Sequence, residues 1–193
     1  PWQSNSIQRA RVLLKEVSQD PDRTLIVVDP RRTESAELAD IHLAVKPGRD
    51  AWALSAMIAH VIQQSLIPMD WLHDNVLGLE RVLERFSDID VDGYAAFAGL
   101  NPADVRAAAE AIAKSRTSAY YEDLGVQMAP HSTLLSYLNL LMMTITGHFG
   151  RPDTLAPLKS LIGQFFALHD VAEADDAGYE PQGRLSPVVG ARI

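Results

Sequence analysis

The stretch TLIVVDPRRT, residues 24–33, holds the strongest structural signal in the chain. Its first half, residues 24–28, is an unbroken apolar run rich in β-branched residues, which is typical of a strand covered on both faces in a parallel sheet. Asp29-Pro30 ends that strand, and Thr33 then precedes acidic residues that suit the first turn of a helix. A strand, a polar turn and a helix in this order predict the first unit of an α/β sheet.

The same alternation continues on both sides of this stretch. Apolar residues recur at helical spacing over residues 7–19, upstream of the strand. Downstream, a second short strand over residues 41–45 leads through KPGRD, residues 46–50, into a strong helix over residues 51–66, which Asp50 is expected to cap. We therefore predict an α/β fold, a Rossmann-like, doubly wound and mainly parallel sheet with flanking helices.

The middle of the chain has a different pattern. Helices are predicted over residues 69–86, 93–99 and 102–115, the last with Asn101 as its cap and Pro102 at its first position. We interpret the segment that begins at Asn101, with its alanine-rich continuation, as a small helical excursion and not as a new core. Residues 118–121 return to strand character and run into EDLGVQ, residues 122–127, before an apolar helix over residues 133–146.

Length and composition suit one cored domain with a trailing extension. The chain has 193 residues, of which 47% are hydrophobic. We place the domain at residues 1–155 and a helix with a tail or linker at residues 156–193, because the sequence from residue 171 is acidic, Gly/Pro-punctuated and aperiodic. The sequence begins at Pro1 without a Met and stops at Ile193 without a structural terminator, so we expect a piece of a longer polypeptide.

Composition excludes several kinds of chemistry. With no cysteine, these residues can form no disulfide, thiolate nucleophile or cysteine-ligated zinc or iron–sulfur centre. A net charge of −8 argues against a nucleic-acid or acidic-lipid partner.

The longest apolar stretch, residues 134–145, is shorter than the roughly 20 residues of a membrane span. The six histidines lack metal-ligand spacing, and His42 and His60 are expected to be structural, so we predict no catalytic and no metal-binding residue.

A ligand site is predicted where the strands end, because open α/β sheets bind ligands at the carboxyl ends of their strands. An acid after a strand suits ribose hydroxyls, and the pair Arg31 and Arg32 suits a pyrophosphate. The carboxylate of Asp50 can accept two hydrogen bonds from the ring NH and amino group of guanine. Structural explanations stay open, since Asp29-Pro30 can be a turn, Asp50 a helix cap, and both arginines solvated. Without a glycine-rich fingerprint a standard NAD or P-loop site is disfavoured.

Several of these segments, in this order, resemble the molybdopterin oxidoreductase family of bis-guanine-dinucleotide enzymes, which includes formate dehydrogenases and nitrate reductases. The resemblance is carried by PWQSN (1–5), VVDPRRTESAELADIHL (27–43), PGRD (47–50), LGVQM (124–128) and GHFGRP (147–152). It spans roughly residues 1–152, and the block from Asp29 to Asp50 is its most specific part.

The resemblance implies that this region is a Rossmann-like domain holding one guanine dinucleotide arm of a molybdenum or tungsten cofactor. By similarity, the cofactor-binding residues are Trp2, Gln3 and Ser4 near the pyrophosphate, Asp29, Arg31 and Thr33 around ribose and phosphate, Gly48, Arg49 and Asp50 at the guanine, and Leu124, Gly125 and Gln127 toward the pterin. Position 49 is Arg where the family commonly has Thr, which leaves a backbone contact and removes a hydroxyl contact.

The resemblance also implies a parent oxidoreductase that moves two electrons at the metal and passes them to an iron–sulfur cluster whose cysteines lie upstream of this region. The implied partners are the remaining domains of the parent chain and its small-molecule substrate. We expect the segment alone to be catalytically silent, to be isolated without cofactor, and to self-associate or be marginally stable. Two alternatives stay open: a domain of this fold that binds another nucleotide, such as NAD or a GDP-like molecule, and an interaction domain with a vestigial pocket.

Overall fold

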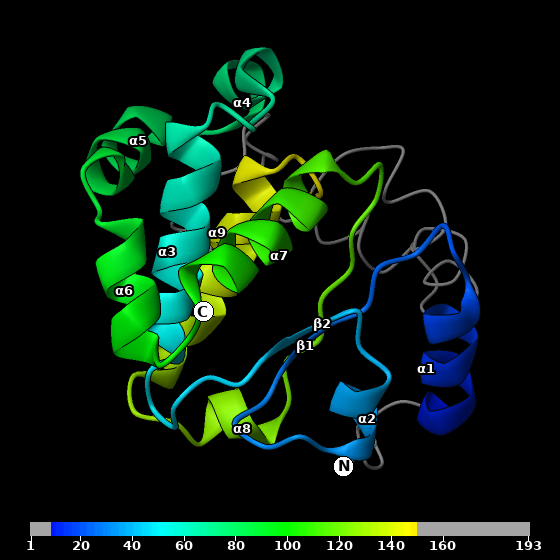
Figure 1. Ribbon diagram of the computed structural model, residues 1–193. Coiled ribbons are helices and arrows are strands. Elements are labelled where there is room, and N and C mark those ends of the chain that lie inside the picture. Colours follow the sequence, from blue (N-terminus) through cyan, green and yellow to red (C-terminus); the bar gives the residue numbers. More distant parts are fainter. Residues whose placement is uncertain (1–8, 150–193) are drawn as a thin grey trace, which may run out of the picture.

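The computed structural model describes residues 9–149, and its sheet is built around the stretch at residues 24–33 (Figure 1). Strands β1 (Ile26–Val28) and β2 (Ile41–Leu43) are parallel, with Ile26 opposite Ile41 and Val28 opposite Leu43. The short helix α2 (Glu34–Glu37) connects them. The predicted order of strand, helix and parallel strand is therefore confirmed.

Helices form most of the rest of the described chain. They are α1 (Ala10–Gln19), α3 (Asp50–Gln63), α4 (Met69–Asn75), α5 (Leu79–Ser87), α6 (Val91–Ala98), α7 (Pro102–Lys114), α8 (Leu124–Gln127) and α9 (Ser132–Ile145). The strongest predicted helices, over residues 51–66, 102–115 and 133–146, correspond to α3, α7 and α9 with small shifts at their ends. None of the helices in the described residues is long and apolar enough to cross a membrane.

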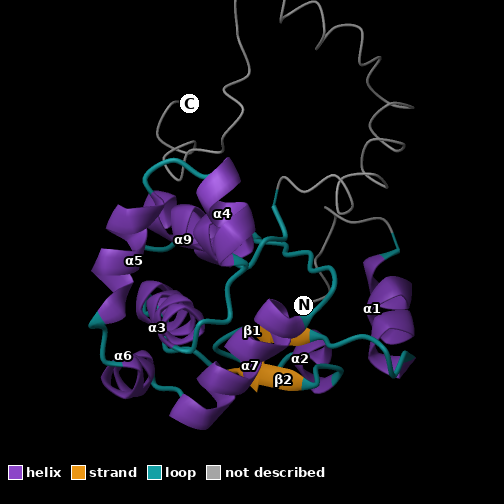
Figure 2. Ribbon diagram, turned by 90° about the horizontal axis from the view of Figure 1, so that it is seen from above, coloured by secondary structure: helices purple, strands orange, loops and turns teal. Residues whose placement is uncertain are grey.

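Helix α3 is the centre of the main core. Helices α5, α6, α7 and α9 all pack against it, and Figure 2 shows α3 surrounded by helices with the two strands to one side. Ala56 and Ile58 of α3 are completely buried, as are Ala95 of α6 and Ala108 of α7. Alanines at these contacts let the helix axes approach closely, and burial of each large aliphatic side chain contributes about 1.5–3 kcal/mol.

The interpretation of the segment from Asn101 as a small helical excursion is wrong, because this segment and the helices before it are part of the main core. Val82 and Phe86 of α5, Val91 of α6 and Val105 of α7 belong to the same buried cluster as the side chains of α3 and α9. The periodicity of these segments correctly indicated helices with one apolar face. It did not indicate what covers that face, because a sequence pattern identifies a buried stripe without identifying its partner.

The predicted doubly wound sheet is not confirmed, since residues 9–149 contain one sheet of two strands. The strand predicted over residues 118–121 is wrong, because this segment has no ladder partner among the described residues. Its aromatic residues Tyr120 and Tyr121 are 40% and 42% exposed, and the adjacent Glu122 bonds to side chains of α9. The domain boundary predicted at residue 155 and the tail at residues 156–193 lie outside the described residues and stay predictions.

Candidate functional site

The carboxyl ends of β1 and β2 meet at one edge of the sheet, because the strands are parallel and in register. The backbone N–H of Asp29 donates to the Leu43 carbonyl at 3.2 Å and extends the ladder beyond β1. The carbonyl of Asp29 in turn accepts a hydrogen bond from Nε2 of His42 at 2.9 Å, so His42 has the structural role expected of it. The two polar segments that follow the strands therefore start side by side.

The turn after β1 is folded by Asp29 itself. Its Oδ1 accepts the backbone N–H of Arg31 at 2.8 Å, which is the geometry of an Asx turn. The turn that the sequence left open as an explanation of Asp29 is therefore present. It directs Arg31 and Arg32 into solvent, and neither guanidinium makes an ion pair within residues 9–149. Two free guanidinium groups next to a strand end are a chemically suitable seat for phosphate oxygens.

Thr33 carries a polar atom without a partner. It occupies the cap position of α2, but its side chain makes no capping bond. Its Oγ1 is buried and has no hydrogen-bond partner among the described residues. Leaving a buried hydroxyl unpaired costs about 1–3 kcal/mol, and an atom of this kind calls for a group that would complete its bonding.

The loop after β2 rests on the C-terminal end of α6. The backbone N–H of Lys46 donates to the Ala98 carbonyl at 2.9 Å. The Lys46 stem crosses Gly99, where an added Cβ would come within 2.7 to 2.9 Å of its carbons. The Arg49 guanidinium lies 3.7 Å from the ring centroid of Phe97, a cation–π contact that links the same loop to α6. The helical region therefore supports the loop in which the guanine contact is predicted.

Asp50 is the first residue of α3, and the cap position before it is Arg49, so the expectation that Asp50 caps this helix is wrong. Burial raises the pKa of the half-buried Asp50 carboxyl, and a hydrogen bond from its own backbone N–H acts in the opposite direction. No other residue in the described part of the chain donates a hydrogen bond to this carboxylate or pairs with it. Its acceptor capacity is therefore available to a ligand.

Gly48 brings a third segment to this loop. It has a positive φ of 77°, a conformation that glycine adopts without strain. A Cβ placed on Gly48 would lie 3.9 Å from Cδ of Pro130 in the turn between α8 and α9. The α8–α9 turn therefore borders the loop that presents Asp50, and Figure 1 shows α8 at the same end of the molecule as the strand ends.

Leu124, Gly125 and Gln127 were predicted to follow a strand. They instead belong to the one-turn helix α8. Asp123 caps it, with Oδ1 accepting the Leu124 backbone N–H at 2.8 Å. None of the α8 residues is buried, and Leu124 is 61% exposed. Trp2, Gln3 and Ser4 lie outside the described residues. The structure thus places Asp29 beside the end of β2 and Pro130 beside Gly48, and α8 directly precedes Pro130 in the chain.

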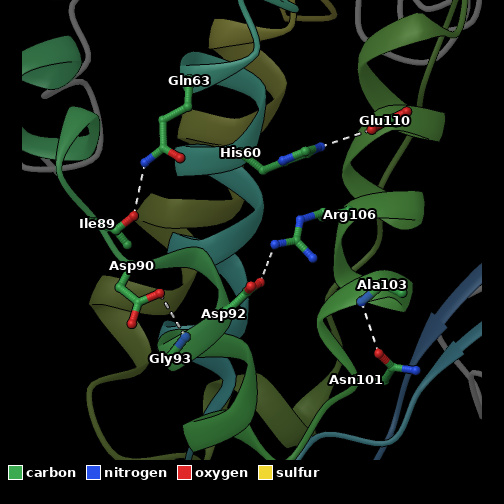
Figure 3. Close-up of polar contacts among 10 residues, drawn as sticks. All are labelled: His60, Gln63, Ile89, Asp90, Asp92, Gly93, Asn101, Ala103, Arg106 and Glu110. Atoms are coloured by element: carbon green, nitrogen blue, oxygen red, sulfur yellow. Dashed lines mark hydrogen bonds and ion pairs between the residues drawn. The ribbon is translucent and has the colours of Figure 1, made fainter.

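Polar side-chain contacts join α3 to α7 and α6 to α7 (Figure 3). His60 of α3 donates through Nε2 to Oε1 of Glu110 on α7 at 3.0 Å, which agrees with a structural role for this histidine. Arg106 of α7 pairs with Asp92 of α6. Asn101 caps α7 as predicted, accepting the Ala103 backbone N–H at 3.0 Å. No group of three or more potential metal ligands occurs within residues 9–149.

A cavity of about 290 Å³ lies elsewhere in the molecule. Its lining residues are Ser65, Leu66, Ile67, Pro68, Ala113, Ser115, Arg116, Thr146 and His148. They lie beyond the C-terminal end of α3, whereas Asp50 begins that helix, and 14 helical residues extend about 21 Å. Both ring nitrogens of His148 already have partners, in Thr146 and Ser115. The strand edge, with its unpaired groups, is therefore the better candidate site.

Three contributors to the site were missed by sequence reasoning. Phe97 and Gly99 hold the loop after β2, and Pro130 borders it. Gly99 carried a usable signal, since a glycine after an alanine-containing helical run is typical of a helix end. Phe97 and Pro130 carried none, because each acts through a contact with a residue distant in sequence.

The comparisons with known proteins agree with the family resemblance. No family model matches the chain. The chain is 28% identical over 137 residues to the assimilatory nitrate reductase catalytic subunit of Bacillus subtilis, covering 71% of this chain and 19% of that protein. It is 56% identical over 50 residues to one subunit of the tungsten-containing formylmethanofuran dehydrogenase 2 of Methanocaldococcus jannaschii, covering 26% of this chain and 11% of that protein.

A solved structure gives the same relationship in three dimensions. Acetylene hydratase from Pelobacter acetylenicus matches with a TM-score of 0.63 and 29% sequence identity, over 67% of this chain and 18% of that chain. Other relatives are nitrate reductases and formate dehydrogenases. The chain spans about a fifth of the length of the curated relatives it matches. It is therefore a homologue of the molybdopterin oxidoreductases, related to one part of those longer proteins.

Proposed function

We propose that this chain holds one guanine-nucleotide arm of the molybdopterin cofactor in a larger molybdenum- or tungsten-dependent oxidoreductase. The observation that supports this most is that two polar segments, residues 29–33 and 46–50, follow the carboxyl ends of two paired parallel strands, so that both segments start at one edge of the sheet. Both segments present groups that the rest of the described chain leaves unpaired. Relatedness to the molybdopterin oxidoreductases makes a guanine dinucleotide the ligand to test first.

The residues at the edge suit the parts of such a nucleotide. Arg31 supplies a guanidinium fork and Arg32 a second cation for the pyrophosphate. The unpartnered hydroxyl of Thr33 can bond to a phosphate or ribose oxygen, and the second carboxylate oxygen of Asp29 can accept from a ribose hydroxyl. Asp50 can accept from the ring NH and the amino group of guanine, and Gly48 and Arg49 shape the loop that presents it.

The remaining cofactor contacts are proposed from the family resemblance. Leu124, Gly125 and Gln127 of the exposed α8 would face the pterin, and Trp2, Gln3 and Ser4 would approach the pyrophosphate. The bound cofactor would supply two-electron chemistry at its metal. The role of this chain's own residues is to bind and orient the nucleotide arm, so we expect no catalytic residue here, and the iron–sulfur cluster and substrate contacts belong to the remaining domains of the parent.

Titration of the full chain with GDP, ADP and NAD, followed by calorimetry, tests the proposal. We expect GDP to bind, ADP and NAD to bind much more weakly, and Asp50→Asn to weaken GDP binding on the order of tenfold or more, since hydrogen bonds to a charged acceptor are lost. Asp70→Asn is a matched control, because Asp70 is an exposed acid in the first turn of α4. Tight NAD binding, or GDP binding that Asp50→Asn leaves intact, would contradict the proposal.

A further inference from the structure

Helix α8 is too short and too exposed to be stable by itself. It is a single turn of four residues, and none of them is buried. Isolated helices of this length are unstable in water, because one turn does not offset the cost of nucleation. The side of α8 at Gly125 faces open space, since a Cβ at that position would meet no atom within 4 Å. Its position is therefore set by its contact with α9 and by the residues that flank it.

The flanking residue Glu122 is bonded to α9 through both of its carboxylate oxygens. Oε1 accepts a hydrogen bond from the Ser136 hydroxyl at 2.5 Å, and Oε2 accepts from Nδ2 of Asn139 at 2.9 Å. Ser136 and Asn139 are three residues apart on α9, so they project from one face of that helix. Hydrogen bonds to a carboxylate are stronger than neutral ones, and two of them fix the direction of the side chain.

The surroundings of Glu122 indicate that this contact is partly shielded from water. Glu122, Ser136 and Asn139 are each half-buried. The pKa of Tyr120 is raised, first by burial and then by the negative charge of Glu122. Directly after Glu122, Asp123 caps α8. Glu122, which is bonded to α9, is therefore followed directly by Asp123, which caps α8. The exposed helix begins at the next residue.

The other end of α8 leads to the loop after β2. Beyond α8, the chain passes Pro130, which borders Gly48 in the loop that presents Asp50. Helix α8 thus lies between Glu122, which is bonded to α9, and the loop after β2. Movement of Glu122 would shift Leu124, Gly125 and Gln127 relative to Asp50 without altering the strand ends themselves.

We propose that Glu122 is a positioning residue that, through Ser136 and Asn139, holds α8 at the distance from the strand edge that the pterin end of the cofactor requires. This inference rests on the proposed function. Both oxygens of Glu122 are bonded to α9, so in this proposal Glu122 acts by holding α8 and not by binding the ligand. It acts by keeping the exposed residues of α8 in one place before the cofactor arrives, which lowers the cost of ordering them on binding.

Amide hydrogen exchange of the full chain without ligand tests the anchor directly. We expect Glu122→Ala to raise the exchange rate over residues 123–129 on the order of tenfold, because local opening of this turn no longer breaks two charge-assisted bonds. Glu122→Gln should restore slow exchange, since its carbonyl can accept from Asn139 and its amide can donate to Ser136. Glu84→Ala, at an exposed acid of α5, is the control. Unchanged exchange in Glu122→Ala overturns the anchor.

Binding separates the positioning role from the proposed function. With molybdopterin guanine dinucleotide and GDP as probes, Glu122→Ala should weaken the dinucleotide on the order of tenfold and leave GDP nearly unchanged, because GDP lacks the pterin; Glu122→Gln should bind both normally. Equal loss of both probes, or loss of neither, overturns the positioning role. If wild-type chain binds neither probe, the proposed function fails and the positioning role fails with it, whatever hydrogen exchange shows about the anchor.

Discussion

The sheet edge and the helical core around α3 satisfy opposite requirements. The core is built from fully buried aliphatic side chains and alanines on α3, α6, α7 and α9, with polar contacts such as that between His60 and Glu110 at its margin. The edge has two three-residue strands, exposed arginines and an unpartnered hydroxyl at Thr33. The core supplies most of the stability. The edge leaves polar side chains without protein partners, so that they are available to a ligand. Substitutions in the two regions should therefore differ in kind as well as in size.

The largest expected difference comes from truncating one aliphatic side chain in each region. Ile58→Ala removes a completely buried side chain of α3 and should lower the free energy of unfolding by about 2–5 kcal/mol. Val28→Ala truncates a strand residue that is 47% exposed and should cost less than about 1 kcal/mol. Urea unfolding followed by circular dichroism measures both. Equal losses would mean that the edge is part of the core.

A glycine substitution tests the connection between the regions. Gly99 has a φ of 82° and lies under the Lys46 stem, so Gly99→Val should lower stability by about 1–2 kcal/mol and also displace the loop that presents Asp50, weakening GDP binding. Gly125→Ala is the comparison, since a Cβ there meets open space and alanine favours a helix. It should leave stability unchanged or slightly higher. Intact GDP binding in Gly99→Val would show that α6 does not support the loop.

The pH dependence of Asp50 should identify it as a ligand group. Because burial raises the folded pKa of this carboxyl, its charge destabilises the free fold, and that penalty appears as pH rises above the ordinary value of 3.8. Asp50→Asn should therefore be slightly more stable than wild type at pH 7 and equal to it at pH 3. GDP affinity should fall as pH is lowered through the raised pKa. Thermal unfolding and calorimetry across this range check both signs, and a less stable Asp50→Asn at pH 7 would refute the first.

Glu110 should give the opposite sign and the smallest effect. Its pKa is lowered by Lys114 first and by His60 second, so its charge stabilises the fold above the unfolded pKa and this contribution is lost as pH falls through the folded pKa. Glu110→Gln should lower the melting temperature slightly near pH 7 and have no effect at the acid end. Because the group is exposed, GDP binding should not change. A change in binding would mean that the margin of the core also shapes the site.

Much of the local structure was predictable because it depends on neighbours in the chain. The strand before Asp29, the cap at Asn101 and the helix α9 each follow from a pattern of a few consecutive residues. Residues 118–121 show the limit, since their β-type side chains found no strand to pair with among the described residues. The cofactor-binding assignments, including those at Asp29 and Asp50, stay predictions that the proposed titrations can decide.

The amino-acid sequence was sufficient for the strand–turn–helix unit around residues 24–33, the apolar faces of the helices and the kinship with the molybdopterin oxidoreductases. Three features became visible only in three dimensions: the apolar faces close on α3, α6 carries the loop before Asp50, and Glu122 ties α8 to α9. Propensity and periodicity act over a few residues, whereas these contacts join residues far apart in the chain. Their partners are therefore selected by the packing of the whole molecule, which no local pattern encodes.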